Sequence, residues 1–554
     1  MGVKGGWDLL NPADSMSLVE WSAQNISTGT LHNSGPCIGV DASGWMFAAK
    51  YHYGQTKSPA QASLFKCLGC LFHLPVSPIF VFDGPKCPLN KCKKNITKTS
   101  DWLTADFKRL LEGFGFPYWD APGEAEAELA LLSNNDRINV VMSEDFDTMV
   151  FGAQRVITDE SDSKYMIKVY EKGAQFSPNE LIMIALLAGG DYDDGIQGCG
   201  IQTAVDITLT GIGERLFEAL KASTVENYPT IASMWCQDLY AMLDSQGAGR
   251  LHSRRHALAS HIPLDFPKVS VLIQYIQPLT SQSTGSFTLP AAPVPCPPDI
   301  PKLAWLCKEL FIWGHLMGIV QNFCDHVFPG LAIRELLQDL HKRRGVMQES
   351  DMSLSSSAII SKVCSIHANQ RERSDSEIFI SLVIPHAVIT QITSSIDGVY
   401  NTDITQNSLE QWLEKCEARV WLSHVLALHA RPNILDDVEH PTSNTAKKHK
   451  HQNSCNKEKG RRIEMPGPTL PPQQSKRVDT KVREESEHWR ETPAGQRARS
   501  VEVINISSDE DERATGKNCR VDVLEMSNLK LSSRNIHYLE SGEILELCTD
   551  DEGT

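Results

Sequence analysis

The sequence predicts an α/β fold in which a mostly parallel sheet is flanked by helices, built from roughly the first 200 residues. Three short apolar runs, at 37–41, 76–82 and 138–142, have the length and composition of buried parallel strands. Longer helical patterns, such as residues 58–74 and 123–135, lie between them. Strands that alternate with helices in this way favour a doubly wound core.

Acidic residues stand at the ends of these runs. Asp41 closes the first run, Asp83 follows the second, and Asp145 follows the third. Because right-handed crossovers bring the carboxyl ends of successive parallel strands to one edge of the sheet, we expect these side chains to meet there. The full set of such acids is Asp41, Asp83, Glu124, Glu126, Asp145, Asp147 and Asp191.

Seven carboxylates at one sheet edge form a site of very high negative charge, which is tolerable only with bound cations. Mg²⁺ takes carboxylate oxygens and waters, and a pair of such ions can clamp both oxygens of a phosphodiester displacement. In open α/β sheets the crevice beyond the carboxyl ends of the strands is where ligands bind. The pattern therefore predicts a metal-dependent phosphodiesterase.

Glu124 and Glu126 also have a simpler explanation, because acids at the start of a helix complement its dipole. The second acidic pair, Asp145 and Asp147, after another strand favours a site instead. Beyond Asp191 comes a Gly-x-Gly turn, formed by Gly198 and Gly200. Two helices joined by such a turn fit a hairpin that offers backbone N–H groups to a phosphate.

The rest of the chain changes in composition. Residues 221–345 have helical patterns, interrupted by a Pro/Ser/Thr-rich loop from about 278 to 301, and a small module follows near 376–435. From 436 onward the chain is polar and cannot bury enough apolar surface to fold alone. The net charge of −16 does not exclude nucleic acid, because the charge is unevenly distributed. The chain has no membrane span and no signal peptide pattern, and its 15 scattered cysteines indicate reduced thiols.

Six motifs occur in a fixed order: MGVKGGWDLL, VDASGW, FVFDGP, APGEAEAELA, SEDFDT and GGDYDDGIQGCG. In this order they resemble those of XPG-type structure-specific endonucleases, the flap endonuclease superfamily, over roughly residues 1–270. The resemblance implies a PIN-like 5′-nuclease core with a helix-two-turn-helix hairpin. It also implies that the seven acids bind two Mg²⁺ ions, for which Mn²⁺ substitutes, and that the free amine of Gly2 lies at the site once Met1 is removed.

The resemblance and the composition together divide the chain into six regions. They are an XPG N-terminal nuclease region at 1–95, an XPG internal nuclease region at 96–190, a helix-two-turn-helix DNA-binding region at 191–270, a helical extension with a Pro-rich loop at 271–375, a chromodomain-like module at 376–435 and a disordered regulatory tail at 436–554.

The stretch between Asp83 and Glu124 is too short for a large helical arch, and it is rich in lysine. It is either a solvated surface loop or a region that contacts DNA phosphates, with Lys91 reaching the scissile phosphate; its tether to a metal-site strand favours the second reading. The short arch and the later blocks EIFISLVIP and ARVWLSHVLALHARP resemble the GEN/Yen group of Holliday-junction resolvases. The DNA-binding candidates are Lys86, Lys91, Lys93, Lys94, Lys98, Gly198 and Gly200.

Two departures from the family pattern bear on DNA affinity. Cys87 and Cys92 occupy positions where Arg is common in relatives, and Ile201-Gln202 stands where relatives often have Pro-Lys. Both changes remove cationic contacts. Neither touches the acids, so these departures are expected to affect DNA affinity and not the chemistry.

Short signals in the tail suggest partners. The segment VEVINISSDEDE, through Val501, Val503 and Ile504, resembles a SUMO-interacting motif, in which an extended apolar strand adds to a partner sheet beside an acidic run. A second segment of this kind begins at Ile544. Lys and Arg clusters between 447 and 462 suggest a nuclear import signal, against the alternative of a solvated charge run.

These observations predict a nuclear, Mg²⁺-dependent hydrolase: a structure-specific DNA endonuclease of recombination and repair. Its substrates would be branched DNA, namely Holliday junctions, 5′ flaps and replication forks, and it would be a monomer in solution that dimerises on junctions. Two alternatives stay open. One is a 5′-flap endonuclease or 5′-exonuclease without junction resolution, and the other is a catalytically silent, SUMO-recruited scaffold that binds junctions.

Overall fold

The computed structural model describes residues 2–27, 35–50, 58–88, 90–91, 94–95, 102–159, 166–245, 255–284, 296–311, 313, 316–343, 359–367, 377–382, 384–396 and 418–435. These residues belong to one of the two units into which the chain divides, Met1–His440 with Val521–Thr554. The predicted tail at 436–554, with Val501, Val503 and Ile504, lies outside the described residues, as do Lys93 and Lys98.

A seven-stranded sheet forms the predicted α/β core. Its strands are β1 (Asp14–Ser17), β2 (Cys37–Asp41), β3 (Ser77–Phe82), β6 (Tyr118–Asp120), β7 (Val140–Met142), β8 (Arg155–Asp159) and β9 (Met166–Glu171). The strand order is β1-β9-β8-β7-β2-β3-β6. Neighbours from β8 to β6 are parallel, whereas β9 runs antiparallel to β8 and β1. The three predicted strands correspond to β2, β3 and β7, and the mostly parallel sheet is confirmed.

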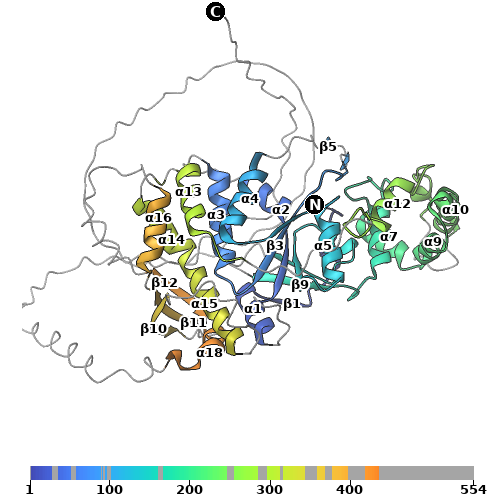
Figure 1. The fold of residues 1–554 in the computed structure, drawn as a ribbon. Coiled ribbons are helices and arrows are strands. Elements are labelled where there is room, and N and C mark those ends of the chain that lie inside the picture. Colours follow the sequence, from blue (N-terminus) through green and yellow to red (C-terminus); the bar gives the residue numbers. More distant parts are fainter. Residues whose placement is uncertain are drawn as a thin grey trace, which may run out of the picture. The chain divides into compact units, whose positions relative to one another are not determined.

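Helices cover both faces of this sheet (Figure 1). Helices α1 (Leu18–Ser27), α2 (Ala42–Lys50), α3 (Pro59–Phe72) and α4 (Trp102–Phe114) lie on one face, and α5 (Ala125–Asn134), α6 (Asp147–Val150) and α7 (Pro178–Ala188) lie on the other. Successive side chains along a strand point to opposite faces of the sheet, which explains this division. Ile38 and Val40 join the buried cluster of α3 and α4, while Cys37 joins that of α5 and α7.

Further helices extend the α7 side: α8 (Ile201–Thr208), α9 (Ile212–Lys221), α10 (Tyr228–Ser245), α11 (His256–Ala259) and α12 (Val269–Ile276). The hairpin predicted around the Gly-x-Gly turn is formed by α7 and α8, joined by residues 189–200. Its first helix therefore begins before residue 191, where the sequence places the start of this region. Gly198 has a φ of +86°, and Gly200 is the N-cap of α8.

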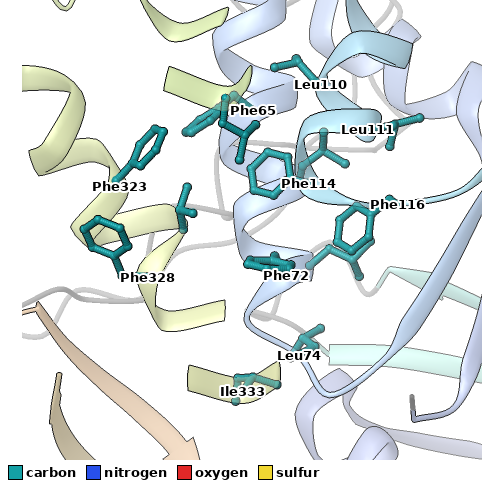
Figure 2. Close-up of a cluster of buried hydrophobic side chains, with 14 of the residues drawn as sticks. Phe65, Phe72, Leu74, Leu110, Leu111, Phe114, Phe116, Phe323, Phe328 and Ile333 are labelled. Atoms are coloured by element: carbon teal, nitrogen blue, oxygen red, sulfur yellow. The ribbon is translucent and has the colours of Figure 1, made fainter. Parts of the chain in front are cut away.

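A second group of helices packs on α3 and α4. It consists of α13 (Ile300–Leu310), α14 (Leu316–His326) and α15 (Phe328–Arg343). Figure 2 shows Phe323 and Phe328 of this group facing Phe65, Phe72 and Phe114 of α3 and α4. These rings are fully buried, so the extension shares one core with the face of the sheet that α1 to α4 cover.

The small module contains three antiparallel strands in the order β10-β11-β12 (Ile360–His367, Glu377–Leu382 and Ala418–Ser423), with α16 (His386–Ser395) and α18 (His424–Ala430). Strand β10 precedes residue 376, so the module begins about 16 residues before its predicted start, inside the range expected to be helical. The polar run 368–376 between β10 and β11 misled the prediction, because it has the composition of a domain boundary.

The module is joined to the helical extension by an arginine fork. Arg431 donates hydrogen bonds to the carboxylates of Glu335 and Asp339, both on α15. Apolar residues of α16 and α18 belong to the same buried cluster as α13 to α15. Across all the described ranges, no helix is both long enough and apolar enough to cross a bilayer.

Candidate metal centre at the sheet edge

The centre of the sheet edge lies between β2 and β7, where the strand order reverses direction. Such a switch point opens a crevice beyond the strand ends. Asp41 is the last residue of β2, and Ser143 and Asp145 follow β7. The Ser143 hydroxyl links the two acids. It donates a 3.3 Å hydrogen bond to Oδ2 of Asp41 and accepts a 3.1 Å hydrogen bond from the N–H of Asp145. The two predicted strand ends therefore meet.

Asp83, after β3, is tied to the same edge through two neighbours. The Ser43 hydroxyl donates to its Oδ2 at 2.9 Å, while the Ser43 N–H donates to Oδ1 of Asp41 at 2.8 Å. The N–H of Ala125, the first residue of α5, donates to Oδ1 of Asp83 at 2.9 Å. Asp83 thus satisfies an amide at a helix start, where negative charge is favourable.

Glu124 and Glu126 enter the site from the start of α5. Glu124 is the N-cap residue, yet its side chain makes no capping hydrogen bond; its Oε2 accepts one from the phenol of Tyr192 instead. Burial, and next the charges of Glu124 and Asp147, raise the pKa of the Tyr192 phenol. Complementing the helix dipole therefore does not account for where the Glu124 carboxylate points.

The N-terminal backbone lies among the remaining acids. The N–H of Gly2 donates to Oδ1 of Asp191 at 3.0 Å, and that of Asp147 donates to Oδ1 of Asp145 at 3.0 Å. A Cβ placed on Gly2 would lie 2.5 Å from Oδ1 of Asp145 and 2.6 Å from Oδ1 of Asp147. Gly2 also has a φ of +77°, so this position requires glycine for both space and conformation.

Five of the seven carboxylates are almost fully buried. Asp83 is exposed and Asp191 half-buried, whereas Asp41, Glu124, Glu126, Asp145 and Asp147 are 3% to 6% exposed. Burying so many acids is unfavourable unless their charge is compensated. An all-oxygen set of this kind fits Mg²⁺ or Mn²⁺.

The carboxylates do not by themselves complete a coordination shell. Within the described ranges, no three His, Cys, Asp or Glu side chains gather closely enough to hold a metal ion. Mg²⁺ usually keeps several waters and binds through one or two carboxylates together with substrate phosphates. The donor set therefore suits ions that share their ligands with solvent and a phosphodiester.

One buried acid next to the site has a different role. Glu128 is fully buried on α5, and its carboxylate accepts hydrogen bonds from Trp119 Nε1 at 3.2 Å, Ser281 N–H at 2.8 Å and Ser281 Oγ at 2.5 Å. It anchors the segment after α12 on α5. Sequence reasoning gave no role to Glu128 or to Tyr192, although both lie in the quoted motifs.

The structure describes the DNA-binding candidates only in part. Lys86 is exposed, and Lys91 pairs with Lys94 in a short antiparallel hairpin formed by β4 (Asn90–Lys91) and β5 (Lys94–Asn95). A Cβ built on Gly200, at the start of α8, would have no atom of the described residues within 4 Å. Gly198 lies in the same turn.

Comparison with known proteins gives consistent matches. The XPG I-region family matches residues 115–191. The mouse DNA excision repair protein ERCC-5 is 27% identical over 214 residues, which is 38% of this chain and 17% of that protein. Flap endonuclease 1-A of Sorghum bicolor is 37% identical over 132 residues, which is 22% of this chain and 35% of that protein. The chain thus spans about a third or less of the length of these curated relatives.

A solved structure matches much more of the chain. The Holliday junction-resolving enzyme GEN1, crystallised in complex with product DNA and a Mg²⁺ ion, aligns with a TM-score of 0.58 and 25% identity. The alignment covers 79% of this chain and 99% of that one. The likeness therefore extends well beyond the region that the family match covers.

Proposed function

The core of this chain belongs to the XPG-type nuclease superfamily and has a GEN-like fold, and from that premise we propose that the protein is a structure-specific DNA endonuclease dependent on divalent metal. The observation that supports this most strongly is the meeting of acids from five separate chain segments at one sheet edge. The Gly2 backbone, between Asp145, Asp147 and Asp191, belongs to the same site.

The acids divide into two groups with different surroundings. Asp83, Glu124 and Glu126 surround the start of α5, and Asp145, Asp147 and Asp191 surround Gly2; Asp41 lies between the groups, linked to Asp83 through Ser43 and to Asp145 through Ser143. We assign one of two Mg²⁺ ions to each group, with Mn²⁺ as a substitute. When bound, such ions lower the pKa of a water and stabilise the leaving oxygen of a phosphodiester.

The substrates we propose are branched DNAs: Holliday junctions, 5′ flaps and replication forks. The β4–β5 hairpin with Lys91 and Lys94 would contact backbone phosphates near the acids, and the turn at Gly198 and Gly200 would contact the duplex backbone. Phosphate contacts position a protein without reading sequence, so specificity would come from DNA shape. Nuclear localisation, dimerisation on junctions and SUMO binding through Val501, Val503 and Ile504 belong to the same proposal.

A 5′-flap endonuclease without junction resolution is the second candidate, favoured by the 37% identity to a flap endonuclease over 132 residues. The two are separated by incubating end-labelled Holliday junction and 5′ flap side by side in Mg²⁺ and mapping the nicks. Junction resolution predicts paired, symmetrical nicks in opposite strands of the junction. Nicks in the flap alone would establish the second candidate, and binding without cleavage of either DNA would establish the silent scaffold.

A further inference from the structure

A tyrosine from a distant helix contacts Gly190 and Tyr192, the residues on either side of Asp191. Tyr275, in the last turn of α12, is 3% exposed, and its ring packs edge-to-face on that of Tyr192 with centroids 4.9 Å apart. A Cβ placed on Gly190 would lie 2.6 Å from Oη of Tyr275. The phenol oxygen therefore rests on the backbone immediately before Asp191, where only glycine leaves it room.

The Tyr275 phenol is a hydrogen-bond donor among acceptors. Its Oη is buried and makes no hydrogen bond to any of the residues that the structure describes. Burial raises the pKa of Tyr275 well above its usual value, and the carboxylates of Asp147, Asp191, Asp145 and Glu124 raise it further. The charges that act on the phenol are those of the acid cluster.

Helix α12 is fixed at both ends to the segments that carry these acids. Before its first turn, Lys268 pairs with Asp193 at 2.5 Å, two residues after Asp191. Beyond its last turn, Ser281 binds Glu128, two residues after Glu126. Tyr275 lies between these two anchors. These two polar anchors, in addition to apolar packing, therefore hold Tyr275 in its position relative to the acids.

We propose that Tyr275 is a positioning residue of the acid cluster: its phenol, which makes no hydrogen bond to the described residues in this structure, would donate to the carboxylates on the Asp147 and Asp191 side and orient them when a cation binds. This inference rests on the proposed function, because it assumes that the cluster binds divalent ions. Groups that hydrogen-bond metal ligands fix the orientation of those ligands, and losing one commonly costs about 10- to 100-fold in metal affinity or activity.

The test is Tyr275→Phe in the full chain, which removes one oxygen and keeps the ring. Calorimetric titration with Mn²⁺ alone is expected to give an affinity about 10-fold or more below that of the wild type. The Mg²⁺ concentration for half-maximal cleavage should rise by a similar factor, and saturating Mg²⁺ should restore most of the rate. A residue that acts only through packing would not make the rate depend on cation concentration in this way.

Tyr228→Phe is the matched control. Tyr228 is equally buried at 3% exposure, and its hydroxyl accepts a hydrogen bond from Gln277 rather than facing the acids. The Tyr228→Phe variant should therefore bind Mn²⁺ with wild-type affinity. Gly190→Ala is a second route to the same effect, because the added methyl displaces the Tyr275 hydroxyl while leaving that side chain intact.

The outcomes separate this inference from the proposed function. Wild-type Mn²⁺ affinity and Mg²⁺ requirement in both Tyr275→Phe and Gly190→Ala would overturn the role of Tyr275 while leaving the nuclease proposal intact. A wild-type protein that binds no Mn²⁺ and cleaves no branched DNA would overturn both. Equal losses of Mn²⁺ affinity in Tyr275→Phe and Tyr228→Phe would also overturn the role of Tyr275, because they would reflect a general packing defect.

Discussion

The backbone N–H of Gly2 donates a 3.0 Å hydrogen bond to Oδ1 of Asp191, which lies 189 residues further along the chain. The start of the chain is held nearby at other points as well. Val3 is 3% exposed, and the indole N–H of Trp7 donates to the carbonyl of Glu144 at 3.0 Å. The first residues are therefore part of the acid site.

Gly2→Ala should reduce cleavage strongly while leaving DNA affinity nearly unchanged. The new methyl would collide with the carboxylates of Asp145 and Asp147, and displacing reacting groups by about 1 Å can cost on the order of 100-fold in rate. Single-turnover cleavage and DNA binding would be measured together. Gly173→Ala is the control, because Gly173 has a similar φ of +74° and open space around it. Equal rates for the two variants would show that the contact with the acids is unimportant.

Glu128→Gln should lower the free energy of unfolding by about 2 kcal/mol, because the Ser281 N–H and hydroxyl lose a buried, charged acceptor. Urea unfolding measures this. Glu112→Gln is the control: Glu112 pairs with Lys302 on the surface, and its loss should cost no more than about 0.5 kcal/mol. If both variants unfold like the wild type, Glu128 is not the anchor that its contacts indicate.

Replacing Lys91 and Lys93 together by Ala should weaken binding to branched DNA and flatten its salt dependence. Each phosphate contact that is lost lowers the slope of log affinity against log salt by about 0.9. Lys172→Ala serves as the control. Lys172 lies outside the lysine-rich stretch, and its ammonium group donates a hydrogen bond to Asn134 on the face of the sheet opposite α4. The affinity would be measured between low and moderate salt. An unchanged slope in the double variant would mean that this loop faces solvent.

The α3–α14 contact should weaken in acid. Burial lowers the pKa of His73 to about 3 and that of His326 to about 4. In the unfolded chain both histidines bind a proton near pH 6.5, whereas in the folded chain they stay neutral until the pH is much lower. The free energy of unfolding therefore decreases as the pH falls from about 6.5 towards 4. Urea unfolding between pH 7 and pH 4.5 should show this loss, and His326→Gln should reduce its slope. A slope unchanged in His326→Gln would place the acid sensitivity elsewhere.

Much of the acid site follows from local sequence. A short apolar run that ends in an acid, as at Asp41, fixes both the strand and the position of its carboxylate, because parallel strands connected by right-handed crossovers share one carboxyl edge. The same reasoning holds for Asp83 and Asp145. The place of Gly2 next to them came from the family resemblance, since no local pattern joins the first residues to Asp191.

The supporting contacts could not be predicted in this way. Tyr275 and Ser281 reach the site from α12 and the segment after it, and nothing in their local sequence indicates which acids they approach. Strand β10 was missed because a polar run separates it from β11. Such features depend on tertiary packing between segments far apart in the chain, which hydrophobic period and turn residues do not encode.

The role of the acids is tested most directly by single-turnover cleavage of labelled branched DNA in Mg²⁺ by Asp41→Ala and Glu126→Ala. Asp136→Asn is the control, because Asp136 is exposed and Asn tolerates its φ of +54°. We expect both cluster variants to lose cleavage while still binding the DNA, and Asp136→Asn to cleave like the wild type. Wild-type cleavage rates in Asp41→Ala or Glu126→Ala would contradict the assignment of this sheet edge as the metal centre.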